Sequence, residues 1–526
     1  MVICNSHLRP VWYGRYALAT VKRAPSSVLA VIAVERTAAT PLYRQIYDGY
    51  RDAIVERRLR AGERLPSTRQ LAAELRISRM PVLIAFEQLL AEGYFESRVG
   101  AGTFVAGSLP GERLARDAHA AARQPVAARP PRSARPPGPG ARPVSSRSEA
   151  LPRPEAQPWL RGLGAFRVSQ PALDRLPLRT WSRLVARHVR GANATLLSYG
   201  SAMGHEPLRE AVAAYLRTAR AVRCEKEQIM AVSGSQQALD LAARVLLDPG
   251  CEVWVEEPGY GGARAALSMA GARLVPVPVD EQGLDVAAGI ARAPRARAAY
   301  VTPSHQYPLG MTMSAARRLQ LLEWARQSGA WILEDDYDSE YRYESLPVAA
   351  LQGLDRDARV IYIGTFSKVL FPALRLGYLA LPADLVVRFA AVRETMDDFP
   401  ATLYQAVLAD FIAEGHFVRH LRRMRQLYRE RRDALVEALE GELGGELRVR
   451  DGRAGMHLAA TLRPGLDDRR LAAEAARQGL WIMPLSSCYL RAAAEQGLVL
   501  GYGGTGVAEI REGVRRLREL LAAAGE

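Results

Sequence analysis

A stretch of about fifty residues, from Gly107 to Pro158, carries no apolar periodicity and divides this chain into two parts. Its centre, residues 128–140, reads ARPPRSARPPGPG. Proline lacks the N–H that a helix needs and arginine stays solvated, so we expect an extended linker; its positive charge would also suit a nucleic acid backbone. The chain should therefore comprise a loose extension over residues 1–35, a small module over 36–106, the linker over 107–158 and a large module over 159–526.

The composition of the whole chain narrows the class of protein. The chain has 526 residues, too many for one ordinary domain, and its 48% hydrophobic and 24% charged content is typical of globular proteins. A formal net charge of +15 favours polyanionic partners. The sequence has no run of about 18 apolar residues and no orderly signal-peptide layout, so we expect no membrane span. Scattered cysteines predict a reducing, cytoplasmic setting with neither disulfide nor metal site: Cys4, Cys224, Cys251 and Cys488.

The small module has the pattern of three helices followed by a two-stranded hairpin. Apolar residues lie near helical spacing over residues 42–59 and again over 82–90. Ser67, with Gln70 three residues later, is a capping-box pattern and predicts the start of a helix between these two. Two short helices joined by a tight turn form the helix-turn-helix arrangement, and residues 94–105 would form its wing.

This module resembles the winged helix-turn-helix of the GntR superfamily of bacterial regulators. Short motifs along nearly all of it carry the resemblance: PLYRQI at 41–46, LPSTR at 65–69, SR at 78–79, EGY at 92–94 and GAGTFV at 100–105. The resemblance implies operator DNA as a partner, and Arg79 would sit at the N-terminal end of the recognition helix, where side chains reach base edges. The predicted DNA-contacting residues are Arg44, Ser67, Arg69, Ser78, Arg79, Gly100, Gly102 and Thr103.

Two observations qualify the DNA-binding interpretation. Met80 and Pro81 stand where small polar residues are usual at the start of this helix, which leaves the base preference open. The module also carries 11 arginines against 8 acidic residues from Arg36 to Ala106, a small excess. The alternative interpretation is a winged-helix module that binds another protein.

The large module alternates apolar strands with amphipathic helices, which predicts a largely parallel sheet covered on both faces. Helical patterns such as residues 235–247 and 314–328 lie between the strands. Binding residues are expected where the strands end. The strand candidates are residues 251–255, 273–277, 299–302, 331–334 and 359–364.

One lysine, Lys368, stands among hydroxyl and apolar residues in the segment TFSKVLFPALRLG at 365–377. Burial disfavours the charged form of lysine, and a neutral amine can form a Schiff base with an aldehyde. The hydroxyls of Thr365 and Ser367, together with Arg375, could hold a phosphate beside it. An aldehyde and a phosphate on one ligand indicate pyridoxal 5'-phosphate.

Other residues of the large module fit the same ligand. The segment VSGSQQ at 232–237 precedes a helix, whose free N–H groups suit a phosphate. Asp335 follows an apolar strand and could pair with a pyridine nitrogen, while Tyr337 could bond the ring oxygen and Tyr260 could stack on the ring. Each also has an ordinary structural interpretation as a cap or a core residue. Their joint order along the chain favours the cofactor site.

This module resembles fold-type I pyridoxal-phosphate enzymes of the aspartate aminotransferase kind over about residues 198–501. The resemblance implies a Schiff base at Lys368, a contact from Tyr337 to the ring oxygen, and a dimer in which Tyr199 reaches the partner subunit's cofactor. It also implies a small C-terminal α+β subdomain. The predicted cofactor-binding residues are Tyr199, Gly234, Ser235, Gln236, Tyr260, His305, Asp335, Tyr337, Thr365, Ser367, Lys368 and Arg375.

The order of the two modules, with a long linker between them, resembles the MocR subfamily of GntR regulators. Three further motifs match it: TPSHQYP at 302–308, EDDYDSE at 334–340 and RHLRRMR at 419–425. The chain is thus identified from its sequence as a multi-domain protein, an α+β winged helix followed by an α/β transferase-like domain.

Two departures from aminotransferases bear on activity. The Asn-Pro-Thr-Gly motif is replaced by HQYPLG at 305–310, where His305 or Gln306 could substitute for the asparagine, or His305 could simply bond backbone. The arginine that clamps a substrate carboxylate is missing from residues 498–501, where Leu498 takes the expected position. Arg453 and Arg491 are nearby in sequence but have no assigned place.

These patterns leave three functional hypotheses. The first is a cytoplasmic transcriptional regulator that senses pyridoxal phosphate or a small amine or amino-acid effector, with a change in the dimer repositioning the winged helices. The second is a working aminotransferase that carries a DNA-binding module. The third is a structural dimer with an inactive site.

Overall fold

The computed structural model describes residues 34–38, 41–56, 58–91, 94–98, 101–106, 144–149, 151, 157–160, 162–343, 349–450 and 452–525. The described residues belong to two compact units, within Met1–Ser133 and Ala134–Glu526. Most of the predicted extension at 1–35 and of the predicted linker at 107–158 lies outside the described residues. No helix in the described ranges is long and apolar enough to cross a membrane.

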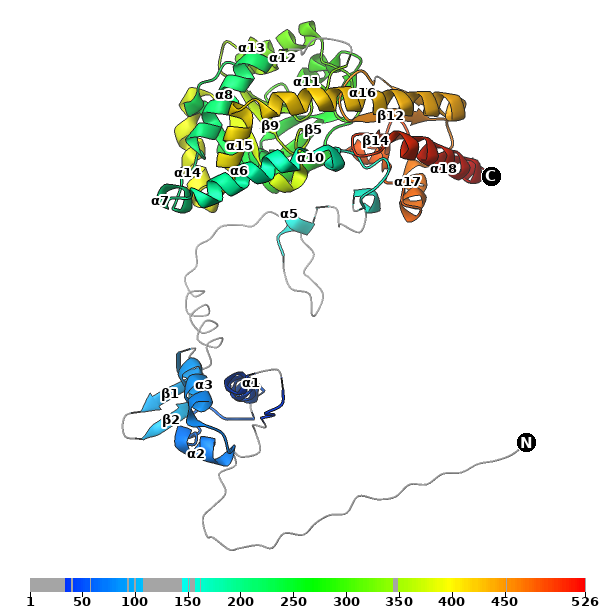
Figure 1. Cartoon of the computed structure of the whole chain (residues 1–526). Helices are drawn as coiled ribbons and strands as arrows, with labels where there is room; N and C mark the ends of the chain where they lie inside the picture. Colours follow the sequence, from blue (N-terminus) through cyan, green and yellow to red (C-terminus); the bar gives the residue numbers. More distant parts are fainter. Residues whose placement is uncertain are drawn as a thin grey trace, which may run out of the picture. The chain divides into compact units, whose positions relative to one another are not determined.

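The small unit is a winged helix-turn-helix (Figure 1). Tyr50, Phe86 and Phe95 meet edge to face at its centre, with ring centroids 5.1–5.6 Å apart. Ser67 caps the second helix by accepting a hydrogen bond from the Gln70 N–H at 3.2 Å, as the capping pattern predicts. The elements are α1 (Leu42–Val55), α2 (Thr68–Glu74), α3 (Arg79–Ala91), β1 (Phe95–Arg98) and β2 (Gly102–Val105).

The large unit is built on an eight-stranded sheet of order β3-β10-β9-β8-β7-β4-β5-β6. β4, β5, β7, β8 and β9 run parallel as expected, whereas β10 is antiparallel to both of its neighbours. β3 and β10 are four-residue strands that the sequence analysis missed. The strands are β3 (Ile229–Val232), β4 (Glu252–Glu257), β5 (Arg273–Asp280), β6 (Gly283–Leu284), β7 (Ala298–Val301), β8 (Trp331–Asp336), β9 (Val360–Thr365) and β10 (Gly377–Ala380).

Helices cover both faces of this sheet and bury its apolar side chains (Figure 1). One face is covered by α9 (Ser235–Leu246), α10 (Gly261–Met269) and α14 (Val386–Asp397). The other face is covered by α8 (Glu206–Arg220), α11 (Val286–Arg292), α12 (Ala315–Ser328), α15 (Leu403–Ala413) and α16 (His416–Leu443). The α/β class expected from the alternation is confirmed.

A smaller α+β subdomain follows the sheet, as predicted. Its four-stranded antiparallel sheet has the order β11-β12-β14-β13, and the 28-residue helix α16 connects it to the large sheet. Its elements are β11 (Leu447–Val449), β12 (His457–Leu462), α17 (Asp468–Arg477), β13 (Met483–Pro484), β14 (Gly497–Gly501) and α18 (Val507–Gly525).

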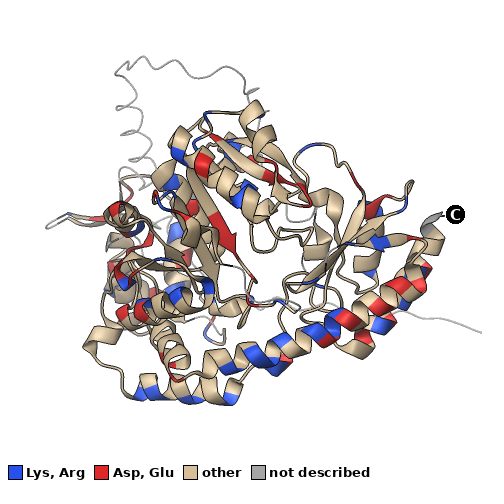
Figure 2. Ribbon diagram, turned by 90° about the horizontal axis from the view of Figure 1, so that it is seen from above, with Lys and Arg blue, Asp and Glu red and all other residues tan. Residues whose placement is uncertain are grey.

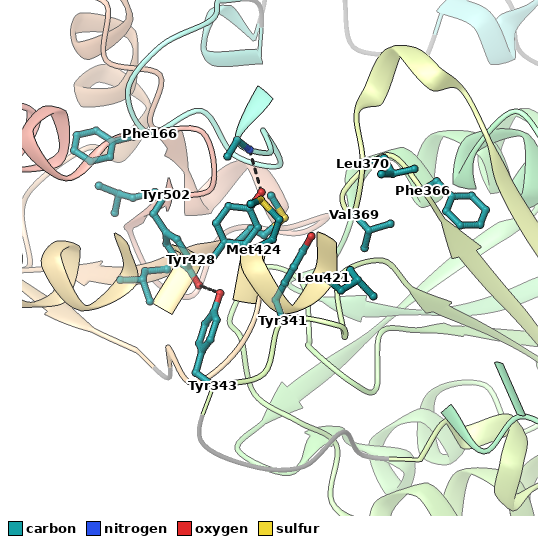
Figure 3. Packing of buried hydrophobic residues seen from close by; sticks show 14 of the residues in the cluster. Phe166, Tyr341, Tyr343, Phe366, Val369, Leu370, Leu421, Met424, Tyr428 and Tyr502 are labelled. Atoms are coloured by element: carbon teal, nitrogen blue, oxygen red, sulfur yellow. Dashed lines mark hydrogen bonds between the residues drawn. The ribbon is translucent and has the colours of Figure 1, made fainter. Parts of the chain in front are cut away.

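One apolar core joins the subdomain to the large sheet (Figure 3). Tyr428 of α16 accepts a hydrogen bond from the Ala172 N–H at 3.0 Å, and the hydroxyls of Tyr343 and Tyr502 lie 3.3 Å apart. Because Phe166 and Tyr502 are fully buried in this core, the N-terminal segment of the large unit is held against the subdomain.

The end of the predicted linker differs from the expected extended chain. Residues Ser146–Glu149 form a short helix, α5, and the Arg147 guanidinium donates to the Met269 carbonyl at the end of α10 at 3.4 Å. Trp159, in the described segment 157–160, is buried against α17. At this end of the predicted linker, four residues are helical instead of extended, and they lie against α10.

Charged residues are spread over the surface helices and also stand on strands inside the sheet (Figure 2). The buried acidic residues on β4 and β8 are Glu256, Glu334, Asp335 and Asp336. Asp336 is neutralised by Arg220 of α8, with a nitrogen–oxygen distance of 2.7 Å and both side chains buried. Asp335 has no arginine partner among the described residues, which marks it for a different role.

Candidate functional site

A cavity of about 280 Å³ opens where the central strands of the large sheet end. Parallel strands place their carboxyl ends at one edge, so residues far apart in sequence converge there. Nine of the twelve predicted cofactor-binding residues line it: Ser235, Gln236, Tyr260, Asp335, Tyr337, Thr365, Ser367, Lys368 and Arg375.

Lys368 lies in the loop between β9 and β10, at the wall of the cavity. Its neighbours Phe366, Val369 and Leu370 are buried in the core, which anchors the loop (Figure 3). The Tyr341 hydroxyl donates to the Lys368 carbonyl at 3.4 Å. Burial lowers the pKa of the Lys368 amine to about 8, so a larger fraction is neutral and nucleophilic near neutral pH.

Asp335 stands at the end of β8 and is 3% exposed. Its Oδ2 accepts a hydrogen bond from the Tyr300 hydroxyl at 2.8 Å, whereas its Oδ1 is buried and has no hydrogen-bond partner. Burial, opposed by that hydrogen bond, raises the pKa of the Asp335 carboxyl to about 7. A buried carboxylate oxygen that faces a cavity without a partner suits a cationic N–H group of a ligand.

Arg375 and the start of α9 form an anion cradle on another side of the cavity. Gly234, directly before α9, has φ +95°, and a Cβ added there would lie 3.6 Å from the Arg375 guanidinium nitrogens. Gly377 allows this approach, since a Cβ at Gly377 would meet the Gly234 Cα at 3.0 Å. Thr365 and Ser367 line the same cavity. Together these groups suit a phosphate.

Tyr337 lines the cavity, and His305 lies behind it. His305 Nδ1 is 3.0 Å from the Tyr337 hydroxyl oxygen and 2.9 Å from Asp338 Oδ1. His305, Asp338 and His457 are all buried, and their nitrogen and oxygen atoms of the kind that bind metal ions lie within 4.8 Å of one another. His305 is not among the cavity-lining residues, so the structure places it as a support for Tyr337 and not beside a ligand.

Gln306, the other proposed substitute for the aminotransferase asparagine, is also held away from the cavity. Its amide donates to the carbonyls of Pro258 and Tyr307 at 2.9 and 2.7 Å. Thr302 donates its hydroxyl to Glu256 at 2.6 Å, which braces the same loop. Tyr307, which the sequence analysis did not select, lines the cavity and meets the Tyr260 ring edge to face at 5.5 Å.

The carboxyl-terminal strand β14 presents apolar side chains to both sides. Leu498 packs into the main core, whereas Val499 joins the cluster that contains the cavity residues Val168 and Tyr307. Val499, and not Leu498, is therefore the β14 residue on the cavity side. Arg453 and Arg491 line separate surface pockets and do not reach the cavity.

One cavity-lining cation was missed entirely. Arg167 lies on the segment before α6 (Leu178–Arg190), about 200 residues before Lys368 in sequence. No motif around it indicates a ligand, so only the folded chain reveals it. The other cavity residues that the sequence analysis did not select are Leu160, Val168, Ser169, Tyr300, Thr302 and Tyr307.

Tyr199 lies away from this cavity. Its side chain is 85% exposed and meets Phe399 edge to face with ring centroids 5.8 Å apart. Leu197, in the neighbouring α7 (Ala194–Leu197), is 71% exposed. Large exposed apolar side chains side by side are typical of a surface that another chain covers.

The predicted DNA-contacting residues are mostly exposed on the small unit. Arg69 and Ser78 are exposed, and Arg79, the first residue of α3, donates its Nε–H to the Thr68 hydroxyl at 3.1 Å. Gly102 has φ +109° in the wing, and the neighbouring Thr103 is half-buried. Arg44 is paired with Asp48 at 3.2 Å, and Gly100 lies outside the described residues.

The cavity residues fit pyridoxal 5'-phosphate, the cofactor of this fold. The unpartnered Asp335 oxygen suits the ring nitrogen, the Gly234–Arg375 cradle suits the phosphate, and Lys368 supplies the amine for the aldehyde. The aromatic side chains of Tyr260 and Tyr307 lie at the same cavity. All of these features belong to this chain and none depends on a second copy.

Comparisons with known proteins agree with both units. Residues 166–516 match the aminotransferase class I and II family, and residues 42–105 match the gntR family of bacterial regulatory proteins. The chain is 30% identical to the α-aminoadipate aminotransferase LysN of Thermus thermophilus, in complex with N-(5'-phosphopyridoxyl)-L-leucine. That match has a TM-score of 0.67 and covers 72% of this chain and 97% of LysN.

Relatives that match both units of the chain are named as regulatory proteins. A probable rhizopine catabolism regulatory protein, MocR of Rhizobium meliloti, is 42% identical over 94% of this chain and 96% of its own length. The pyridoxine biosynthesis transcriptional regulator PdxR of Corynebacterium glutamicum is 30% identical over 90% of this chain and 94% of its own. The chain therefore belongs to the MocR-type gntR family of transcriptional regulators, with a winged helix-turn-helix and a pyridoxal-phosphate-binding domain of aminotransferase class I and II.

Proposed function

We propose that this protein binds operator DNA through its winged helix and that the state of the Lys368 cavity controls that binding. One observation carries the proposal. A cavity with a nucleophilic lysine, a phosphate cradle and an unpartnered buried carboxylate oxygen is encoded in the same chain as a helix-turn-helix. Bound pyridoxal phosphate would supply an aldehyde carbon that either the Lys368 amine or a small amine displacing it could bond. The effector is the cofactor itself or such an amine.

Different cavity residues would bind different groups of the cofactor. Arg375 and Ser235 would hold the phosphate, Asp335 would pair with the ring nitrogen, and Tyr260 would stack on the ring. The Tyr337 hydroxyl would contact the ring oxygen, and it is positioned by His305 Nδ1, which lies 3.0 Å from that hydroxyl and 2.9 Å from Asp338 Oδ1. A ligand alters DNA binding only through a difference in its affinity for two arrangements of the protein.

A dimer is part of this proposal. Tyr199 and Leu197 are exposed in the single chain, and a second copy that covers them would bring Tyr199 to the partner's cavity. A pair of winged helices would then read two half-sites, so the operator is expected to be a repeated sequence. Sedimentation of the cofactor-loaded protein, with Tyr199→Ala for comparison, tests the surface.

Arg79→Ala is expected to weaken DNA binding by roughly tenfold to a hundredfold, because an arginine at the start of a recognition helix contributes about 1–3 kcal/mol at its base pair. The measurement is a gel shift with the upstream DNA of the protein's own gene, at fixed salt. Arg58→Ala is the matched control, since Arg58 is exposed after α1 and paired with Glu56.

The same gel shift tests the proposal as a whole. Wild-type protein is expected to retard the upstream fragment, and adding pyridoxal phosphate is expected to change the apparent affinity. The absence of a retarded band both with and without pyridoxal phosphate would contradict regulation. Equal binding by Arg79→Ala and wild type would contradict only the assignment of the recognition helix.

The alternative function is amino-acid transamination, which the Lys368 cavity favours and the apolar β14 strand opposes. We expect at most slow conversion of an amino acid to its oxo acid, with the amino group passing to the cofactor. Without a charge-assisted clamp on β14, about 1.5–3 kcal/mol of binding is absent there. Absorbance and oxo-acid release across an amino-acid panel measure it, and sustained turnover would favour the enzyme.

A further inference from the structure

Two arginine side chains line the Lys368 cavity, whereas the cofactor has one strongly anionic group, its phosphate. Arg375 lies at the Gly234 cradle, where a phosphate fits. Arg167 is a second guanidinium on the cavity wall, and its charge is close enough to lower the pKa of Lys368. A second guanidinium that the cofactor's phosphate does not neutralise favours a second anion at this cavity.

The main chain around Arg167 is fixed by the C-terminal subdomain. The Ala165 carbonyl accepts from the Trp481 N–H at 2.9 Å, and the Phe166 carbonyl accepts from the Gly501 N–H at 2.9 Å. The Phe166 N–H donates to the Thr505 hydroxyl at 3.1 Å. These contacts hold the residue beside the cavity.

The side chain of Arg167 is also held in place. One guanidinium nitrogen donates to the Trp159 carbonyl at 3.0 Å and the other donates to the Leu160 carbonyl. Two neutral carbonyls orient the guanidinium without cancelling its charge. The fork is therefore preorganised, which lowers the entropy lost when it binds an anion.

No acidic side chain of the described residues forms an ion pair with Arg167. Burial lowers its pKa, which reflects the cost of holding an unneutralised charge away from water. The two acidic residues whose charges raise the pKa of Lys368, Asp335 and Asp338, are hydrogen-bonded to Tyr300 and His305. The remaining N–H groups of Arg167 are thus available to a ligand's carboxylate.

We infer that Arg167 binds the carboxylate of the effector, so the sensed ligand is a primary amine that also carries a carboxylate. This inference rests on the proposed function and specifies its ligand class. The ligand's amine would take the place of the Lys368 amine at the cofactor's aldehyde carbon, which releases the Lys368 amine, and the carboxylate would pair with Arg167 at the same cavity. Simple amines lack the second contact and bind weakly.

The test uses full-length protein loaded with pyridoxal phosphate and calorimetric titration. Each common amino acid, and β-alanine, is compared with the matched amine that has the same structure without the carboxylate. For L-alanine and for β-alanine this amine is ethylamine. At least one acid is expected to bind roughly tenfold more tightly than its amine, the factor expected for a charge-assisted hydrogen bond. If no acid binds, or each amine binds as well as its acid, the inference is wrong.

Variants locate the contact. Arg167→Gln is expected to bring acid and amine within about threefold of each other, and Arg167→Lys to keep part of the preference. Arg491→Gln is the matched control, because Arg491 is exposed at a separate surface pocket. A preference that survives Arg167→Gln would overturn the assignment. Should that variant fail to fold, Arg167→Lys and the wild-type comparison of acid with amine still decide.

Two further measurements separate this inference from others. If Arg167→Gln weakens pyridoxal phosphate binding by the same factor as it weakens acid binding, Arg167 serves the phosphate and the inference fails. Retardation of upstream DNA by wild type, together with equal binding of acids and amines, would leave the proposed regulator intact and remove only the carboxylate contact.

Discussion

Lys368→Ala is expected to abolish the visible absorption of the cofactor-loaded protein and any response of DNA binding to an amine. The band requires an imine between the cofactor and a lysine, and among the described residues Lys368 is the lysine that lines the cavity. Arg375 and Asp335 remain, so non-covalent cofactor binding persists but weakens. Absorbance after dialysis and a gel shift with added amine measure the two effects.

The chain has only three lysines among its 71 basic residues: Lys22, Lys226 and Lys368. Few other lysines can therefore form the imine. Lys226→Ala is the control, since Lys226 pairs with Glu206 on the surface. Borohydride reduction followed by peptide mass spectrometry should place the pyridoxyl group on Lys368. A full band in Lys368→Ala, or attachment to Lys226, would contradict the site.

The pH dependence of cofactor capture follows from the same lysine. An ordinary lysine has a pKa of 10.5, and that of Lys368 is lowered to about 8. The rate of covalent capture is therefore expected to rise with pH and to level off above about pH 8, because only the neutral amine attacks. A rise that continues beyond about pH 10 would show that Lys368 is not the buried amine described above.

Asp335→Asn is expected to have opposite effects with and without the cofactor. In the cofactor-free protein the pKa of Asp335 is raised from 3.8 to about 7, so the folded state holds a proton that the unfolded state releases. Wild-type stability therefore falls as pH rises from about 4 to 7 and is constant above that. Asparagine has no such loss, so the variant gains up to about 4 kcal/mol at about pH 8 and nothing at about pH 4.

With the cofactor bound, the sign reverses. The carboxylate then pairs with the ring nitrogen, and its loss is expected to weaken cofactor affinity by roughly tenfold to a hundredfold. Thermal unfolding at several pH values, with and without pyridoxal phosphate, measures both effects. Asp384→Asn, at an exposed position, is the control. A stability difference that does not depend on pH would show that Asp335 is not held protonated near neutral pH.

The parts of the site that the sequence predicted share one property. Lys368 and Ser235 each follow a strand of the large sheet, and Asp335 stands at the end of one. In an α/β sheet such positions converge at one edge, so the order of strands along the chain is enough to bring them together. The capping pattern at Ser67 was equally local, and the structure confirms it.

The parts that the sequence analysis missed depend on packing between distant segments. β3 and β10 are short apolar runs that could equally belong to helices. Successive side chains of a strand point to opposite faces of the sheet, so Leu498 and Val499 of β14 lie on opposite faces. Only the packing of the folded sheet shows that Val499 is the residue on the cavity side. His305 and Gln306 were plausible ligand contacts until their partners Asp338 and Pro258 were seen.

The sequence by itself determined the two-module organisation, the family and the cofactor, and it singled out the lysine that we propose holds the cofactor, because these depend on local patterns and on strand order. Only the tertiary structure decided which side chains face the ligand and which support them. Arg167 comes from a segment about 200 residues before Lys368, and its place at the cavity depends on contacts with the C-terminal subdomain. Such contacts are long-range, and no pattern within either segment encodes them.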